Sequence, residues 1–400
     1  MQTSTSSLLL KAVRSRLTGV AVTLLVALAM VAHGLAVPAV AAVNPQIEVT
    51  DLSLTKVNAA NEEQGGELYV KGLTLLTFNW DASKITPKEG DSFAISLPAE
   101  FKFHSTIERT MTYKERLPGG GEKEHTIGAC TFTSNIATCT FGGEIDSLVQ
   151  AGKKDIRGTG RYQLDVKTST TLEELPFVIN ADKTVQVDLP GEGGIQKPSG
   201  AVYRPNMYLV KGYNGFMREG DTEAVWYFMF GGPRFQDELG VTFDGQTERT
   251  ITFKDTLGAG MSCENKKLRL IYLSAGDSEE NPSQSVLLDK GTETGPTNTP
   301  GHGTFEVTGE CGEMAPDGTT PITFVAKGPF RAKTNYSISY RTVFTGDGKA
   351  LPGTDYTNTV SVDGTKIKKT STTSFVEAAS IEVSMRQGEG TFSITKKIGS

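Results

Sequence analysis

The sequence lacks the residue patterns that most enzyme and metal sites require. It has four histidines, and none stands in an HExxH motif or another His-rich metal spacing. There is no G-x-S-x-G nucleophile elbow and no glycine-rich phosphate loop followed by Lys and Ser or Thr. We therefore expect no general catalytic centre, no metal and no cofactor. A glycosidase on a β-sandwich stays open, because its two carboxylates could lie anywhere in the sequence.

Long apolar runs are also absent, except for one at the N-terminus. Three basic residues precede a run from Val20 to Val37, and small residues then allow cleavage near Ala41 or Ala42. This order predicts a secretory signal peptide over residues 1–42. The alternative is a membrane anchor, since the run approaches spanning length. We expect an exported mature protein with no membrane segment.

Basic residues are outnumbered by acidic ones. The chain has 40 Lys and Arg against 46 Asp and Glu, a formal net charge of -6. Since the predicted signal peptide holds three basic and no acidic residues, the mature chain moves to -9. Nucleic-acid binding needs a basic surface, so this balance argues against that partner, and we expect no nucleic-acid binding. It identifies no other partner.

No long stretch sustains helical periodicity, and short alternating runs with turn residues between them take its place. EIDSLVQAG is the one stretch that we expect to form a short helix. The pattern predicts an all-β chain built of antiparallel β-sandwiches. The alternating runs are LSLTKV, LTLLTFNW, SFAISLP, YQLDV, AVWYFMF, ITFKDTL, LRLIYL, ITFVA, YSISYRTVF and TNTVSV.

The Gly- and Pro-rich stretch LPGEGGIQKPSG, residues 189–200, is the best candidate for a domain boundary. It predicts a first module over residues 43–192 and a second over residues 199–385, both of ordinary domain size. We expect a long polar loop from Gly276 to Gly303. Residues 386–400 are expected to be a linker or the start of a further module, so that the chain would be part of a longer protein.

Four cysteines in an exported protein predict disulfides. With Ser134 and Asn135 at the tip of a two-residue hairpin in ACTFTSNIATCTF, Cys130 faces Cys139 at a non-hydrogen-bonded pair. Cα atoms in such pairs lie about 4.5 Å apart, within reach of a disulfide. Cys263 and Cys311 then pair by elimination. The metal alternative lacks CxxC spacing and nearby histidines.

Three polar residues of the second module continue the apolar faces of their strands. Lys211 shares a face with Met207 and Leu209, Asp255 with Ile251 and Phe253, and Asn358 with Tyr356 and Val360. Burial favours a neutral lysine, which is a nucleophile, and a protonated carboxyl, which can polarise an amide and shuttle protons. We hypothesise an isopeptide crosslink between Lys211 and Asn358, promoted by Asp255. The alternative is that Lys211 reaches solvent while Asn358 bonds to a neighbouring turn.

The first module repeats this pattern in a weaker form. Lys56 shares a face with Leu52 and Leu54, and Asp91 with Phe93, while Asn180 is the nearest candidate amide. We do not predict a second crosslink from it.

The order of Lys on an early strand, Asp in TFKDTL and Asn in YTNTVSV resembles the intramolecular isopeptide domains of Gram-positive surface proteins. Most of residues 47–385 resembles the paired Ig-like, MSCRAMM-type region of the clumping-factor, serine-aspartate-repeat and collagen-adhesin family. The residues that carry this are LTFNWDASKITPKEGDSFAISLPAEFKF and ATCTFGGEIDSL in the first module, and AVWYFMF and ITFKDTL in the second. The resemblance implies two tandem Ig-like antiparallel β-sandwich domains.

The resemblance also implies a function, that of a surface adhesin attached to the cell through a region not in this chain. Its partner would be a host extracellular-matrix protein, a peptide or a glycan, held in a trench between the two domains near residues 189–200. Residues 379–390 would close over the ligand by strand addition, or else form an ordinary last strand and linker. The alternative function is a structural pilus or stalk subunit. We expect a monomer or one part of a surface stalk.

Overall fold

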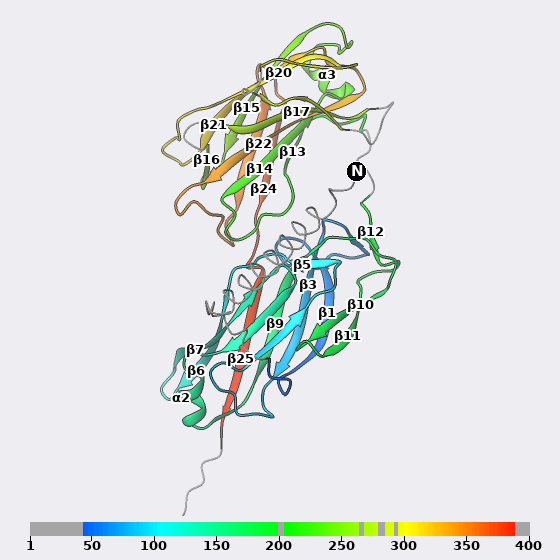
Figure 1. Ribbon diagram of the computed structural model, residues 1–400. Helices are drawn as coiled ribbons and strands as arrows, with labels where there is room; N and C mark the ends of the chain where they lie inside the picture. Colours follow the sequence, from blue (N-terminus) through cyan, green and yellow to red (C-terminus); the bar gives the residue numbers. More distant parts are fainter. Residues whose placement is uncertain (1–42, 199–203, 264–267, 279–284, 292–294, 389–400) are drawn as a thin grey trace, which may run out of the picture. The chain divides into compact units, whose positions relative to one another are not determined.

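The computed structural model describes residues 43–198, 204–263, 268–278, 285–291 and 295–388 (Figure 1). The predicted signal peptide, residues 1–42, lies outside the described residues, as does most of the predicted C-terminal linker. Strands dominate the described residues and form sandwiches, so the all-β prediction is confirmed. Helix α2 (Ile145–Gln150) and helix α3 (Pro233–Leu239) are short. No helix in the described part of the chain is both long and apolar enough to cross a membrane.

The first sandwich is one long sheet that curls around one large core. Within the described residues it has eleven strands, in the order β1-β3-β9-β25-β6-β7-β8-β4-β10-β11, with β5 paired to β9. Its end strands β1 and β11 contact each other, so the sheet encloses the apolar side chains of one cluster. The strands are β1 (Glu48–Val57), β3 (Leu73–Asp81), β4 (Ser92–Ser96), β5 (Phe101–Phe103), β6 (Arg109–Leu117), β7 (Gly121–Phe132), β8 (Ile136–Phe141), β9 (Lys153–Val166), β10 (Glu174–Ile179), β11 (Lys183–Asp188) and β25 (Ala379–Gln387). A separate parallel pair joins β2 (Leu68–Tyr69) to β12 (Ile195–Gln196).

The second sandwich packs two sheets face to face over a separate, aromatic-rich core. The described residues give each sheet six strands. One sheet holds β13 (Val210–Tyr213), β14 (Glu223–Phe230), β16 (Met261–Ser262), β17 (Arg269–Ser278), β18 (Val286–Asp289) and β22 (Thr334–Phe344). The facing sheet holds β15 (Arg249–Leu257), β19 (Thr297–Thr299), β20 (Gly303–Cys311), β21 (Thr320–Gly328), β23 (Tyr356–Val362) and β24 (Lys368–Thr373).

The alternating runs of the sequence all overlap strands, and EIDSLVQAG contains α2. Strict alternation explains this agreement, since β14, β21 and β23 bury every second side chain. Helix α3 was not predicted, although Pro233 at its first turn and left-handed Gly240 at its end are the usual signals.

The prediction of a long polar loop from Gly276 to Gly303 is wrong for the part that the structure describes; residues 279–284 and 292–294 lie outside the described residues. Strands β18 and β19 lie inside the predicted loop. Leu288 is buried in the second core, and the Asp289 carboxylate accepts hydrogen bonds from the backbone amides of Gly291 and Val307. A short strand in a polar segment is thus fixed by tertiary contacts that local composition does not reveal.

The last strand, β25, belongs to the first sheet although it follows the whole second sandwich in sequence. It pairs antiparallel with β9 from Ala379 to Gln387 and parallel with β6 at Glu382 and Val383. In Figure 1 it is the red strand beside β9. Residues 379–385, which the sequence pattern assigns to the second module, therefore complete the sheet of the first.

Candidate functional site

The second sandwich brings Lys211, Asp255 and Asn358 together in its core. The Lys211 ammonium lies 2.7 Å from a carboxylate oxygen of Asp255, and neither side chain is exposed to solvent. Asn358 is 0% exposed. The alternative in which Lys211 reaches solvent is therefore wrong, because the lysine side chain ends inside the sandwich.

The three residues come from facing sheets. Lys211 lies on β13, opposite Phe228 of β14. Asp255 of β15 pairs with Val360 of β23, so Asn358, two residues from Val360, shares its face as a diagonal neighbour. A bond between Lys211 and Asn358 would tie β13 of one sheet to β23 of the other. Because β24 follows β23 in the facing sheet, β23 is not the last strand of this sandwich.

Sequence reasoning missed Tyr340, which holds the group together. Its hydroxyl donates to Asp255 at 2.8 Å, and it accepts from the Asn358 amide nitrogen at 2.8 Å and from the Lys211 ammonium. Tyr340 lies on the buried face of YSISYRTVF, opposite Trp226. A buried Tyr hydroxyl needs a polar partner, and that rule was the signal that could have found it.

Aromatic rings surround the Lys211 ammonium. It lies 4.7 Å from the ring centroid of Tyr340, 5.5 Å from that of Phe228 and 5.6 Å from that of Trp226. Burial in this environment lowers the pKa of Lys211 and, against the attraction of the lysine, raises the pKa of Asp255. Both shifts favour the uncharged amine and the protonated carboxyl.

One polar atom of the group has no hydrogen-bond partner among the described residues. It is the side-chain carbonyl oxygen of Asn358, which is buried. An unsatisfied buried carbonyl costs about 1–3 kcal/mol. The group thus offers an amine, a carboxyl and an amide whose carbonyl is free to accept a proton, which is the set that the hypothesised crosslink requires.

The structure does not bring together the weaker set in the first module. The Lys56 ammonium donates to the backbone carbonyl of Gly65, and Asp91 accepts from the side chain of Asn44. The amide of Asn180 is satisfied by the backbone, since it accepts from Ala94 and donates to Ile47.

The cysteines pair as the sequence predicts. Cys130 and Cys139 lie directly opposite each other on β7 and β8, with Cα atoms 3.9 Å apart. Cys263 and Cys311 are also joined, with Cα atoms 6.4 Å apart. Each sandwich therefore has one disulfide. Among the described residues, no cluster of His, Cys, Asp and Glu is arranged to hold a metal ion.

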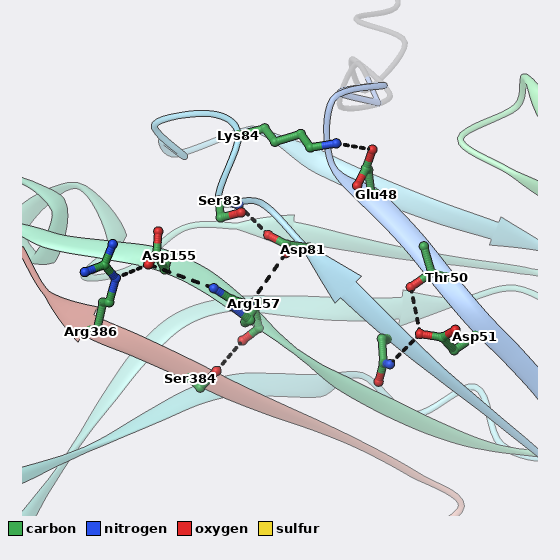
Figure 2. A network of polar contacts seen from close by, with 11 residues as sticks. Glu48, Thr50, Asp51, Asp81, Ser83, Lys84, Asp155, Arg157, Ser384 and Arg386 are labelled. Atoms are coloured by element: carbon green, nitrogen blue, oxygen red, sulfur yellow. Dashed lines mark hydrogen bonds and ion pairs between the residues drawn. The ribbon is translucent and has the colours of Figure 1, made fainter.

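The place between β9 and β6 where β25 pairs with both strands is a second candidate site, which we call the β25 seat. The outer face of β25 is polar there. Figure 2 shows Ser384 and Arg386 of β25 beside Asp155 and Arg157 of β9. Arg386 contacts the Asp155 carboxylate, and the Ser384 hydroxyl donates to the Arg157 backbone carbonyl at 3.3 Å. Arg157 in turn lies 4.0 Å from Asp81 of β3. The inner face is apolar, because Ala379 and Ile381 are buried in the first core.

A family model described as "Domain of unknown function (DUF7926)" matches residues 208–388. This range begins just before β13 and ends just after β25, so it includes both Lys211 and Asn358. A comparison with curated proteins found no match.

Solved structures of Gram-positive surface proteins are similar to the chain over most of its length. The collagen adhesin of S. aureus is 15% identical, with 86% of this chain and 96% of that chain covered and a TM-score of 0.42. The collagen-binding domain of Erysipelothrix rhusiopathiae surface protein RspB is 14% identical, with 84% and 96% covered and a TM-score of 0.41. The Enterococcus faecalis MSCRAMM ACE is 13% identical, with 84% and 97% covered and a TM-score of 0.41.

Proposed function

We propose that the chain is an exported surface adhesin that binds a host matrix protein, peptide or glycan in a trench between its two sandwiches. The observation that carries this proposal is the position of β25. A strand that follows the whole second sandwich in sequence adds to a sheet of the first sandwich, which is the geometry of strand addition.

Strand β25 is the only strand between β9 and β6 in the described sheet. Without β25, strands β9 and β6 lose the strand that joins them in one sheet. The segment that follows the second sandwich is then no longer attached to the first sandwich. With β25 in place, the connection through the second sandwich forms a closed loop. In our proposal a ligand enters while β25 is out and is enclosed when β25 docks.

We further propose that Lys211 and Asn358 form an isopeptide bond. The neutral Lys211 amine attacks the side-chain carbonyl carbon of Asn358, while protonated Asp255 donates to the carbonyl oxygen. The carbon–nitrogen bond of the Asn358 amide then breaks. Asp255 passes the proton from the attacking amine to the leaving nitrogen, so that one ammonia is released and a secondary amide remains. No oxidant or cofactor is needed.

A structural role in a pilus or stalk is the second candidate, and the buried Lys211–Asp255–Asn358 group favours it. A covalent tie between facing sheets resists mechanical unfolding whether or not the protein binds a ligand. In that case β25 would be a permanent strand of the first sandwich.

The crosslink is tested by the intact mass of the purified protein, reduced and unreduced, beside Lys211→Ala and Asn358→Ala. We expect the wild type to be lighter than its sequence by one ammonia, and neither variant to show this deficit. The exposed Lys254, on the same strand as Asp255, gives a matched control, and Lys254→Ala should keep the deficit. A wild-type mass that differs from the sequence only by the disulfide hydrogens would contradict the crosslink.

Ligand binding is tested by surface plasmon resonance against immobilised matrix proteins and glycans, with collagens included because the similar proteins are named for them. We compare the wild type with Ile381→Asp, which puts a charge on the buried face of β25. An adhesin should bind one ligand and dissociate faster in the variant. Absence of binding across the panel, with the mass deficit present, would favour the stalk.

A further inference from the structure

The inner face of β25 continues three rows of side chains that cross the sheet. Leu76 of β3, Tyr162 of β9 and Ala379 form the first row. The other two rows each have a glycine on β9 between an aromatic and an aliphatic residue. They are Phe78–Gly160–Ile381 and Trp80–Gly158–Val383.

The two glycines make room for different neighbours. A Cβ atom on Gly160 would lie 2.0 Å from the ring of Phe78, so this glycine accommodates a side chain of the first core itself. A Cβ atom on Gly158 would lie 1.8 Å from the backbone carbonyl oxygen of Glu382 in β25 and 2.8 Å from the edge of the Trp80 ring. A glycine inside a strand often marks a place where another backbone approaches closely.

We propose that Gly158 is the specificity-determining residue of the β25 seat. It lets the backbone of β25 lie against β9 at a distance that any side chain at position 158 would prevent. The seat then selects an extended, antiparallel segment whose backbone can lie close to β9, as β25 does from Ala379 to Val383. This inference rests on the proposed docking of β25 in the adhesin.

The polar outer face of β25 cannot supply this selectivity. The side chains of Arg386 and Arg157 are 62% and 52% exposed, and exposed ion pairs contribute little to stability. A clash with a backbone carbonyl is different, because the backbone cannot turn away as a side chain can. The fit of β25 is therefore decided on the inner face, at Gly158.

The test is hydrogen–deuterium exchange on the full-length protein, comparing wild type with Gly158→Ala, Gly160→Ala and Gly121→Ala. A Cβ atom on Gly121 of β7 meets nothing within 4 Å, so this variant controls for the substitution itself. In Gly158→Ala we expect the amides of residues 380–386 to exchange about ten- to hundredfold faster. Those of β3 should lose much less protection, because the Trp80 ring lies farther from the new Cβ atom than the Glu382 carbonyl oxygen does. Gly160→Ala should loosen β3 as well, and Gly121→Ala should match the wild type.

Wild-type protection of residues 380–386 in Gly158→Ala would overturn the role of Gly158 and leave the docking of β25 intact. Equal loss of protection in β3 and β25 would also overturn it, since Gly158 would then serve the core in general. Unprotected residues 380–386 in the wild type would overturn both this inference and the proposed latch. If Gly158→Ala does not fold, Val383→Asp tests the same row from β25 and should selectively expose residues 380–386.

Discussion

At the scale of single residues, the Tyr340 hydroxyl is the shared partner of the buried polar group in the second sandwich. It contacts Lys211, Asp255 and Asn358. Such a network stabilises the core only while each member keeps its partners, because an unpaired polar group is costly in a low dielectric.

Replacing Tyr340 with Phe should therefore destabilise the second sandwich and slow the proposed crosslink. We expect a loss of about 1–3 kcal/mol in the free energy of unfolding, measured in the Lys211→Ala background so that no covalent bond interferes. The crosslink rate is measured separately, in the protein that keeps Lys211, as the appearance of the mass deficit after refolding. Tyr227→Phe, on the same sheet but only partly buried, is the control. An unchanged rate and stability in Tyr340→Phe would show that the hydroxyl is not needed.

His125 of the first sandwich lies between two carboxylates. Its ring nitrogens are 2.9 Å from Glu144 and 3.1 Å from Glu115, and Glu115 also contacts Lys153. The hydrogen bonds with Lys153 and then with His125 hold the pKa of Glu115 below its ordinary value, and the hydrogen bond with His125 does the same for the pKa of Glu144.

A carboxyl whose pKa is lowered by folding adds stability above its unfolded pKa, about 4.3 for Glu, and this stability is lost as the pH falls through the folded value. The first sandwich should therefore lose stability in acid from about pH 5 downward. In His125→Gln the free energy of unfolding should fall less steeply as the pH decreases. Urea unfolding at a series of pH values, followed by Trp80 fluorescence in a Trp226→Phe background, measures it. The same dependence of the free energy of unfolding on pH in the wild type and in His125→Gln would contradict the role of His125.

At the scale of elements, the two faces of β25 differ in what they contribute. The inner residue Ile381 is 7% exposed and packs in the first core, whereas Arg386 makes an exposed ion pair. The apolar face should therefore hold the strand in place.

Ile381→Ala should weaken the docking of β25 by about 2–4 kcal/mol, and Arg386→Ala by less than about 1 kcal/mol. Hydrogen exchange of residues 380–386 measures both changes in the full-length protein. A larger effect of Arg386→Ala would mean that the outer polar network, and not the inner face, seats the strand.

At the scale of the whole molecule, the described residues form two large cores, each with one tryptophan and one disulfide. The Cys263–Cys311 bond spans 48 residues and the Cys130–Cys139 bond spans 9. Longer closed loops lose more entropy in the unfolded chain, so the two disulfides should differ in effect.

Replacing Cys263 and Cys311 by Ser should cost the second sandwich about 4 kcal/mol, and replacing Cys130 and Cys139 should cost the first about 2.5 kcal/mol. Single-tryptophan proteins that keep Trp80 or Trp226 report the two transitions separately. Equal losses, or losses in the wrong sandwich, would contradict this assignment.

Much of the fold could be predicted from the sequence because strand alternation is a local property. Residues two apart share a face, so YTNTVSV and ITFKDTL reveal on which side Asn358 and Asp255 lie. The hairpin register is local as well, since the turn at Ser134 and Asn135 sets Cys130 opposite Cys139. The crosslink itself stays a prediction, because proximity of the three side chains is not a bond.

Alternation does not say which strands become neighbours, and tertiary structure alone decided that. It brought Lys211 of one sheet into contact with Asp255 of the facing sheet, placed the Tyr340 hydroxyl beside both, and inserted β25 beside Gly158. These contacts join segments between 44 and about 225 residues apart, where any of many pairings would satisfy the same local pattern. The sequence by itself determined the strongly alternating strands and their buried faces, whereas the packing of whole sheets selected the partners, because only complete burial of both cores distinguishes one pairing from another.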